Sequence, residues 1–157
     1  MLQIVILMVG KTRTGFIQAG MDLYTKRLVP YGKLSLLSVP EEKPRPGLTP
    51  EQIKEREGAR LLARLPKPAR IIALEASGQE FNSQEFAQWL SQMEYEAHSP
   101  LIFVIGGHLG LSNALVAAAN HRLALSRFTF THELSRLILL EQLYRACTIR
   151  AGHPYHY

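Results

Sequence analysis

Short apolar runs alternate with segments of helical spacing along the whole chain. The runs have the length of buried strands, and the segments between them repeat apolar residues every three or four positions. The expected strands are Leu2–Val9, Lys33–Val39, Arg70–Leu74, Leu101–Ile105 and Leu123–Leu125, and the expected helices are Gly15–Leu28, 50–65, one capped by Ser83, Asn113–Ala119 and His132–Ile149. This alternation predicts an α/β fold with a mostly parallel sheet and helices on both faces.

Two further expectations follow from the pattern. In the first helix the spacing predicts that Phe16, Met21, Tyr24 and Leu28 face inward. Parallel sheets bind ligands outside the carboxyl ends of their strands. The loops that follow Leu74, Ile105 and Leu125 are therefore the expected binding region.

The 157 residues favour one domain, residues 1–157, because no linker, repeat or low-complexity segment divides them. No apolar run approaches the roughly 20 residues that cross a bilayer. The apolar start lacks the basic region of a signal peptide, so we interpret it as a first strand and expect a cytoplasmic protein. Cys147 is the single cysteine, which fits a reducing compartment and favours a buried side chain over a catalytic thiol.

A formal net charge of +5 gives the first indication of a partner. Surfaces with this balance attract phosphate backbones or anionic membranes. The charge is not gathered into one run, which argues against a disordered basic tail. Lys11, Arg13, Lys26 and Arg27 are candidates for phosphate contacts.

The stretch "LIFVIGGHLGL", residues 101–111, ends a buried strand with Gly106, Gly107 and Gly110. It does not match GxGxxG, and no Gly-Lys-Ser/Thr follows, so a dinucleotide site or an NTPase is poorly supported. Two interpretations remain. The glycines could form only a tight turn, or they could let a flat, uncharged heterocycle approach the backbone closely.

The last helix and the tail carry the remaining signals. His132 and Arg136 lie one turn apart on one side of the helix, and Glu141 and Arg145 lie on roughly the opposite side. Apolar residues cover most of the circumference, which predicts either a second subunit or a chain segment passing over the helix. The tail "HPYHY" adds histidines and tyrosines that could form a cluster with Arg145.

Three segments together resemble the ribosomal RNA large subunit methyltransferase H family of the SPOUT class. They are "LQIVILMVGK", "FVIGGHLGL" and "LALSRFTFTHELSRLILLEQLYRACTIRAGHPYHY". The resemblance implies an S-adenosylmethionine-dependent enzyme that methylates N3 of a pseudouridine in 23S rRNA. Because a domain this small has little separate surface for RNA recognition, we expect the ribosome to supply much of the specificity. It also implies a C-terminal trefoil knot, and a homodimer whose active sites are completed across the interface.

The same resemblance implies roles for particular residues, and it implies no metal and no membrane partner. Residues expected to bind the cofactor are Leu74, Gly106, Leu125, Ser126, Arg127, Phe128, Thr129 and Phe130. From their chemistry we expect Arg145, Tyr155 and His156 to act in catalysis. His132, Arg136 and His153 are expected to contact the RNA substrate, and His132 and Arg136 could instead orient the cofactor loop at the start of the last helix. Under this interpretation the paired glycines leave room for the cofactor.

The chain departs from the family pattern at Thr131, where proline is usual, and at His108 and Leu109, where a small or acidic residue is usual. These changes lie near the expected cofactor loops.

Two other functions remain as alternatives to a methyltransferase. They are an RNA-binding α/β protein without catalysis and a nucleotide-binding hydrolase.

Overall fold

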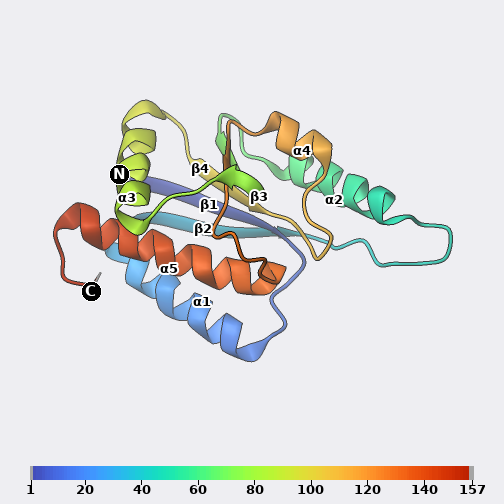
Figure 1. Cartoon of the computed structure of the whole chain (residues 1–157), viewed down its shortest axis with the longest axis horizontal. Helices are drawn as coiled ribbons and strands as arrows, with labels where there is room; N and C mark the ends of the chain where they lie inside the picture. Colours follow the sequence, from blue (N-terminus) through green and yellow to red (C-terminus); the bar gives the residue numbers. More distant parts are fainter. Residues whose placement is uncertain (1, 156–157) are drawn as a thin grey trace.

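A computed structural model describes residues 2–155 of the chain and shows alternating strands and helices (Figure 1). The strands are β1 (Leu2–Val9), β2 (Gly32–Val39), β3 (Arg70–Gln79), β4 (Leu101–Ile105) and β5 (His121–Leu123). The α-helices are α1 (Gly15–Leu28), α2 (Pro50–Arg64), α3 (Ser83–Glu96), α4 (Asn113–Ala118) and α5 (His132–Ala151), and a short 3-10 helix η1 (Val29–Tyr31) follows α1.

The strands form one sheet in the order β2-β1-β4-β3-β5, and every neighbouring pair is parallel. Alternating side chains of β1 and β4 point to opposite faces, as the pleat requires. One face packs against α1, α3 and α5, and the other packs against α2 and α4. The predicted α/β class, with helices on both faces of a parallel sheet, is confirmed.

Several boundaries differ from the sequence prediction. β3 continues to Gln79 where the sequence suggested a loop after Leu74, and β5 is His121–Leu123 instead of Leu123–Leu125. Asn82, not Ser83, caps α3, because its side chain accepts the Glu85 N–H in a capping box. These features depend on pairing and capping between particular atoms, which hydrophobic spacing does not specify.

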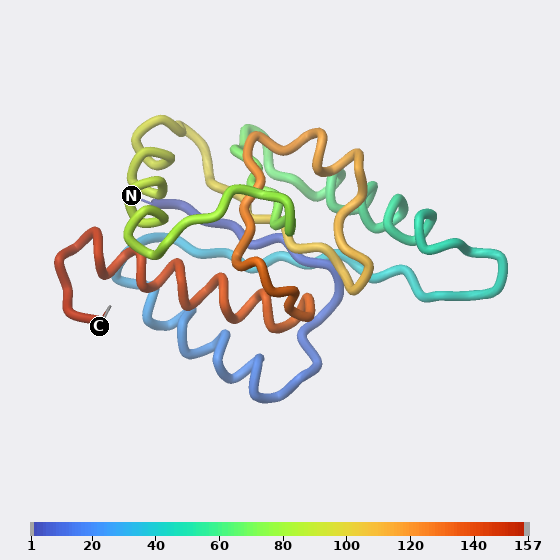
Figure 2. Tube along the Cα trace, in the orientation of Figure 1, coloured from blue at the N-terminus to red at the C-terminus, as the bar shows by residue number. Residues whose placement is uncertain are grey.

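The pairing of β3 with β5 is irregular. Leu123 pairs with Leu74 and also with Gln79, so residues 75–78 curve around the segment that contains Leu123. The Ala124 N–H donates to the Gln79 carbonyl at 3.0 Å, and a Cβ on Gly78 would lie 2.7 Å from the Arg122 and Leu123 backbone. Figure 2 shows these two stretches of chain crossing in front of the sheet.

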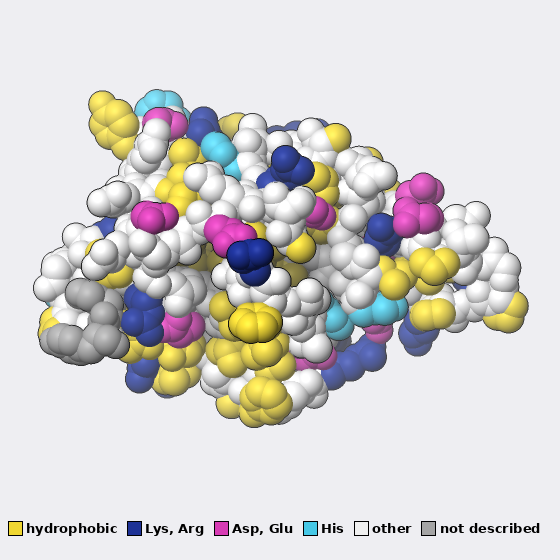
Figure 3. Space-filling view, viewed as in Figure 1, with side chains coloured by type: hydrophobic (Ala, Val, Ile, Leu, Met, Phe, Trp, Pro, Cys, Tyr) yellow, Lys and Arg dark blue, Asp and Glu magenta, His cyan; other side chains and the backbone are white. Residues whose placement is uncertain are grey.

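The sheet side of α5 is buried and includes Leu139, Leu140 and Leu143, whereas Leu137, Ile138 and Tyr144 are half-buried. α1 packs closely along it, because Gly20 leaves room for the Leu137 side chain, which a Cβ would meet at 2.7 Å. The prediction that Phe16 faces inward is wrong. Phe16 is 70% exposed, since Ile17 takes the buried position instead. Figure 3 shows hydrophobic side chains on the surface over this region.

Candidate active site

The glycine turn after β4 is built by close contact between its own two arms. Gly107 and Gly110 form an isolated antiparallel bridge, and the Gly110 N–H donates to the Gly107 carbonyl at 3.0 Å. A Cβ on Gly106 would lie 2.5 Å from the carbonyl carbon of Gly110, and Gly110 itself has φ of +87°. The turn therefore requires Gly106 for its own backbone, whatever ligand it approaches.

A cleft of about 640 Å³ opens beside this turn at the carboxyl ends of the strands. Its walls come from the glycine turn, from residues 129–133 before and at the start of α5, and from the β1–α1 connection. A smaller pocket of about 170 Å³ adjoins it and shares Leu74, Thr129, Phe130 and Ser135 with it. These walls include two of the three loops expected from the sequence, and Leu74 from the third.

The structure brings most of the expected cofactor residues together. Leu74, Gly106, Thr129 and Phe130 line the cleft, and Leu125, Ser126 and Phe128 line the adjoining pocket. Arg127 lines neither and is exposed. Phe128 is 83% exposed, so much of its ring remains in solvent. His108 and Leu109, the departures from the family pattern, also line the cleft.

The first turn of α5 fixes the β1–α1 connection against the cleft. Thr131 caps the helix, because its hydroxyl accepts the Leu134 N–H at 3.2 Å. The Glu133 carboxylate accepts the backbone N–H groups of Arg13 and Thr14 at 2.9 and 3.0 Å. The hydrogen bond from Thr14 is the main cause that lowers the pKa of Glu133.

The lowered pKa of Glu133 makes part of the free energy of unfolding depend on pH. Because the pKa of Glu133 is lower in the folded state, its charge stabilises the fold above the unfolded pKa of about 4.3. That contribution is lost as pH falls through the lower folded pKa. We expect Glu133→Gln to be less stable than the wild type at pH 7, with the difference shrinking below about pH 4. Urea unfolding across this pH range measures it. Glu55→Gln, at an exposed α2 position, is the control, and a difference that is constant with pH would contradict the expectation.

His132 lines the cleft, as a substrate-contacting residue would, and its pKa is lowered by burial and by the nearby Arg136. It is therefore mainly neutral at pH 7 and can accept as well as donate a hydrogen bond.

The prediction that Arg136 contacts RNA is wrong for this structure, because its side chain is 1% exposed. Its guanidinium donates to the carbonyls of Val9 and Gly10 at 2.6 and 3.1 Å and to the Thr12 hydroxyl at 2.8 Å. Arg136 thus joins the end of β1 to α5 and fixes the backbone of Val9 and Gly10.

A second group of functional candidates lies near the other end of α5. The Arg145 guanidinium donates from Nε and Nη2 to Glu141 Oε1 at 3.0 and 2.6 Å. It also lies over the Tyr155 ring, 4.9 Å from the ring centre. The Tyr155 hydroxyl is 3.2 Å from the Tyr24 hydroxyl and donates to Glu141 Oε1 at 3.3 Å. The predicted tail cluster of Arg145 and Tyr155 thus exists, with Glu141 and Tyr24 as further members.

The charges in this cluster are well defined. The hydrogen bond to Glu141 raises the pKa of Arg145, so the guanidinium stays charged. Burial, followed by the contact with Tyr24, raises the pKa of Tyr155, so its phenol stays neutral. His153 Nδ1 is 2.7 Å from the Tyr31 hydroxyl, which fixes the tail on η1. His156 lies outside the described residues.

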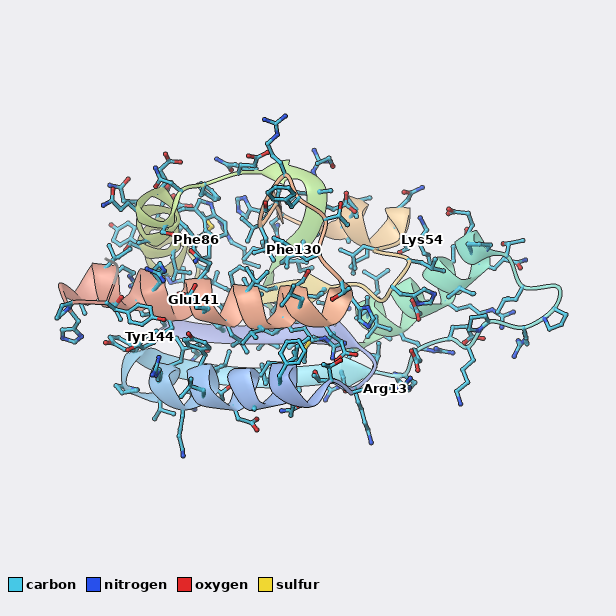
Figure 4. All side chains as sticks on the ribbon, turned by 60° about the horizontal axis from the view of Figure 1, so that its bottom comes forward. Arg13, Lys54, Phe86, Phe130, Glu141 and Tyr144 are labelled. Atoms are coloured by element: carbon cyan, nitrogen blue, oxygen red, sulfur yellow. The ribbon has the colours of Figure 1, made fainter. Side chains whose placement is uncertain are left out.

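The cleft and the tail cluster are well separated within one chain. Arg145 is 13 residues along α5 from His132, or about 20 Å at the rise of an α-helix. Figure 4 shows the same arrangement, with Glu141 and Tyr144 toward the C-terminal end of α5, away from Phe130.

Other kinds of site have little support. Burial raises the pKa of Cys147 to about 11, so its thiol is not a nucleophile at neutral pH. Within residues 2–155 no group of three or more His, Cys, Asp or Glu side chains could hold a metal ion. None of the helices in that range combines the length and apolar character needed to span a membrane.

Comparisons with known proteins identify the family to which the chain belongs. Residues 2–156 match the family described as "Predicted SPOUT methyltransferase". The chain belongs to the SPOUT methyltransferase family. Within it, the chain is 42% identical to the ribosomal RNA large subunit methyltransferase H of Listeria monocytogenes and 40% identical to that of Carboxydothermus hydrogenoformans. Each comparison covers 99% of both chains.

Solved structures agree on the fold of this SPOUT methyltransferase. A probable methyltransferase from Bordetella pertussis superposes with a TM-score of 0.57 at 14% identity, over 93% of this chain and 95% of the other. The TrmH/SpoU tRNA modifying enzyme of A. aeolicus superposes with a TM-score of 0.51 at 13% identity, over 97% of this chain and 78% of the other. At these identities the likeness concerns the fold alone.

Sequence reasoning missed three residues of this SPOUT methyltransferase site. Glu141 stands four residues before Arg145, and that spacing was visible as a possible ion pair but was not assigned a role. Glu133 follows the helix cap, where an acidic residue is common for helix stability alone. Helical spacing predicted that Tyr24 faces inward, but not its contact with Tyr155, because only the fold places α1 beside the tail.

Proposed function

We propose that this chain uses S-adenosylmethionine to methylate N3 of a pseudouridine in 23S rRNA, in the cytoplasm and on the assembled ribosome. Family membership over nearly the whole chain carries the proposal, since relatives at 40% identity and above over full length are named as ribosomal RNA large subunit methyltransferase H. The cleft at the carboxyl ends of the strands supports it independently.

The residues around the cleft fit the proposed cofactor. The volume of the cleft is sufficient for a drug-sized molecule. Its walls combine apolar side chains with the backbone of a glycine turn. Leu74, Gly106, Thr129 and Phe130 would hold the nucleoside and the amino acid part, with His108 and Leu109 at the edge. When bound, S-adenosylmethionine supplies a methyl group already activated on a sulfonium.

We further infer that the threading of the chain closes a trefoil knot. Residues 75–78 curve around the strand that contains Leu123, and the chain then continues through residues 125–130 into α5. This crossing lies beside the smaller pocket, which Leu74, Leu123 and Leu125 all line. A threaded backbone would hold the pocket walls rigid, because neither segment can move away without the other.

We also propose a homodimer in which each active site draws on two chains. The tail cluster is about 20 Å along α5 from the cleft of its own chain, too far to act there. An antiparallel arrangement along α1 and α5 would bring the cluster of one chain to the cleft of its partner. The exposed apolar side chains of Phe16 and Leu23 and the half-buried Leu137 and Ile138 suit such an interface.

In the proposed reaction the protein orients the base and stabilises its anion. N3 of pseudouridine carries an imide proton and is a poor nucleophile until that proton leaves. A charged Arg145, held by Glu141, can stabilise the deprotonated base, and a neutral Tyr155 can donate a hydrogen bond to it or stack on it. His156 is the proposed proton acceptor or a hydrogen-bond partner of the base edge, and His132 and His153 are proposed substrate contacts.

Two measurements test the proposal. Calorimetry with S-adenosylmethionine should show binding, which a non-catalytic RNA-binding protein would lack. Transfer of tritiated methyl groups to ribosomes from a strain without the modification, followed by nucleoside mapping, should place the label on N3 of one pseudouridine. Equal methylation of naked rRNA fragments would contradict the assembled ribosome as substrate, and no transfer at all would contradict the function.

A further inference from the structure

A cluster of arginines surrounds one buried carboxylate beside the end of β2. The Glu42 side chain is 9% exposed and accepts a hydrogen bond from Arg56 Nη1 at 3.1 Å. Arg60 Nη2 donates to its other oxygen, and Arg45 Nη2 lies 3.8 Å from Oε1. Arg60 also donates to the Pro40 carbonyl at 3.0 Å, so it belongs to the local framework.

The positive charge of this cluster exceeds its negative charge. Three guanidinium groups share the single carboxylate of Glu42, and the side chains of Arg45 and Arg56 remain 60% and 47% exposed. Within the described residues, Arg56 uses one nitrogen for Glu42, and Arg45 approaches it only loosely. The outward-facing donors of both are available to an anionic partner, in the planar arrangement that suits phosphate.

The cluster is joined to the glycine turn through Glu57, which is 2% exposed. Glu57 Oε2 accepts the backbone N–H of Glu42 at 3.0 Å. On the other side, a Cβ on Gly107 would lie 3.1 Å from Glu57 Oε1. Glu57 therefore lies between the arginine cluster and the glycine turn, and the arginines lie at the same edge of the sheet as the cleft.

Further cations extend this edge. Lys11, Arg13 and Lys43 are exposed near the ends of β1 and β2, although Arg13 is paired with Glu41. Figure 4 shows Arg13 and Lys54 at this end of the molecule, and Figure 3 shows Lys and Arg side chains beside histidines on its surface. These cations lie at the same edge of the sheet as the cleft, where they can contact the phosphates next to a base that enters it.

We propose that Arg45 and Arg56, held by Glu42, form an RNA phosphate-binding surface that positions the substrate strand at the cleft. The proposal rests on the proposed function, since it assigns the surface that receives the RNA of that reaction. Phosphate is favoured over an acidic protein surface because both guanidiniums project free donors, and phosphate contacts are the usual means of positioning RNA and DNA.

The test compares Arg45→Ala/Arg56→Ala with the wild type on ribosomes that lack the modification. Removing two phosphate contacts should raise KM for the ribosome about tenfold and lower the slope of log KM against log salt by about 1.5. The effect should fall on KM and not on kcat, because phosphate contacts bind the ground state and the transition state alike. The dissociation constant for S-adenosylmethionine should stay at the wild-type value.

Lys33→Ala/Lys67→Ala is the matched control, because it removes the same charge from exposed positions at the opposite edge of the sheet. Its KM should match that of the wild type. An unchanged KM and salt slope in the arginine variant, with an active wild type, would overturn the surface while leaving the function intact. A wild type without cofactor binding or methyl transfer would instead remove the function. Weaker binding to ribosomes with unchanged binding to a naked rRNA fragment would assign the surface to a ribosomal protein and overturn the RNA proposal.

Discussion

Arg145→Ala is expected to lower the rate of methyl transfer by about a thousandfold, the usual cost of removing a donor that stabilises a developing anion. The guanidinium is charged, donates two hydrogen bonds to Glu141 Oε1, and lies against the Tyr155 ring. The proposed cofactor cleft of the same chain is about 20 Å away along α5, so the affinity for S-adenosylmethionine should change little. Single-turnover methyl transfer and calorimetry measure the two effects separately.

Arg150→Ala is a closely matched control for this prediction. Arg150 lies on the same helix, its side chain is 24% exposed like that of Arg145, and it also forms an ion pair with a glutamate, Glu94. It should retain the wild-type rate. Arg145→Lys keeps a charge but loses the paired donors, so an intermediate rate is expected. Full activity of Arg145→Ala would remove the residue from the mechanism.

Gly106→Ala is expected to weaken cofactor binding at least tenfold and to lower the free energy of unfolding by about 2–3 kcal/mol. The new Cβ would lie 2.5 Å from the Gly110 carbonyl carbon and 2.9 Å from the Leu111 nitrogen, so backbone atoms must move. The turn that forms one wall of the cleft would then open or shift. Urea unfolding measures the stability, and calorimetry with S-adenosylmethionine measures the affinity.

Gly15→Ala is the control for the glycine prediction, because a Cβ there meets nothing within 4 Å and the residue starts a helix. This variant should keep both affinity and stability. Wild-type affinity in Gly106→Ala would show that the cofactor does not bind beside this turn.

Much of the fold was predictable because hydrophobic spacing reports local geometry. The β1 and α1 boundaries match the prediction, and the parallel α/β class follows from the alternation of elements. The shorter β5 and the long β3 were not predictable, because Leu123 pairs with both Leu74 and Gln79, and only the folded backbone brings these residues together. Phe16 satisfied the helical spacing and is nevertheless exposed, since the choice between Phe16 and Ile17 depends on which face of α1 meets the sheet.

For the site, the residue types were visible in the sequence and their partners were not. The motifs around Gly106, residues 125–130 and Arg145 could be given expected roles because each is a contiguous stretch that resembles the family. Three contacts of the site could not be predicted. Arg136 is buried against the end of β1, Arg145 is held by Glu141 and Tyr155, and three arginines share Glu42. Each depends on the folded backbone or on the side-chain rotamer that it selects. Spacing along a chain encodes which side of an element a residue occupies, whereas the folded backbone alone determines which distant atoms come within hydrogen-bonding distance.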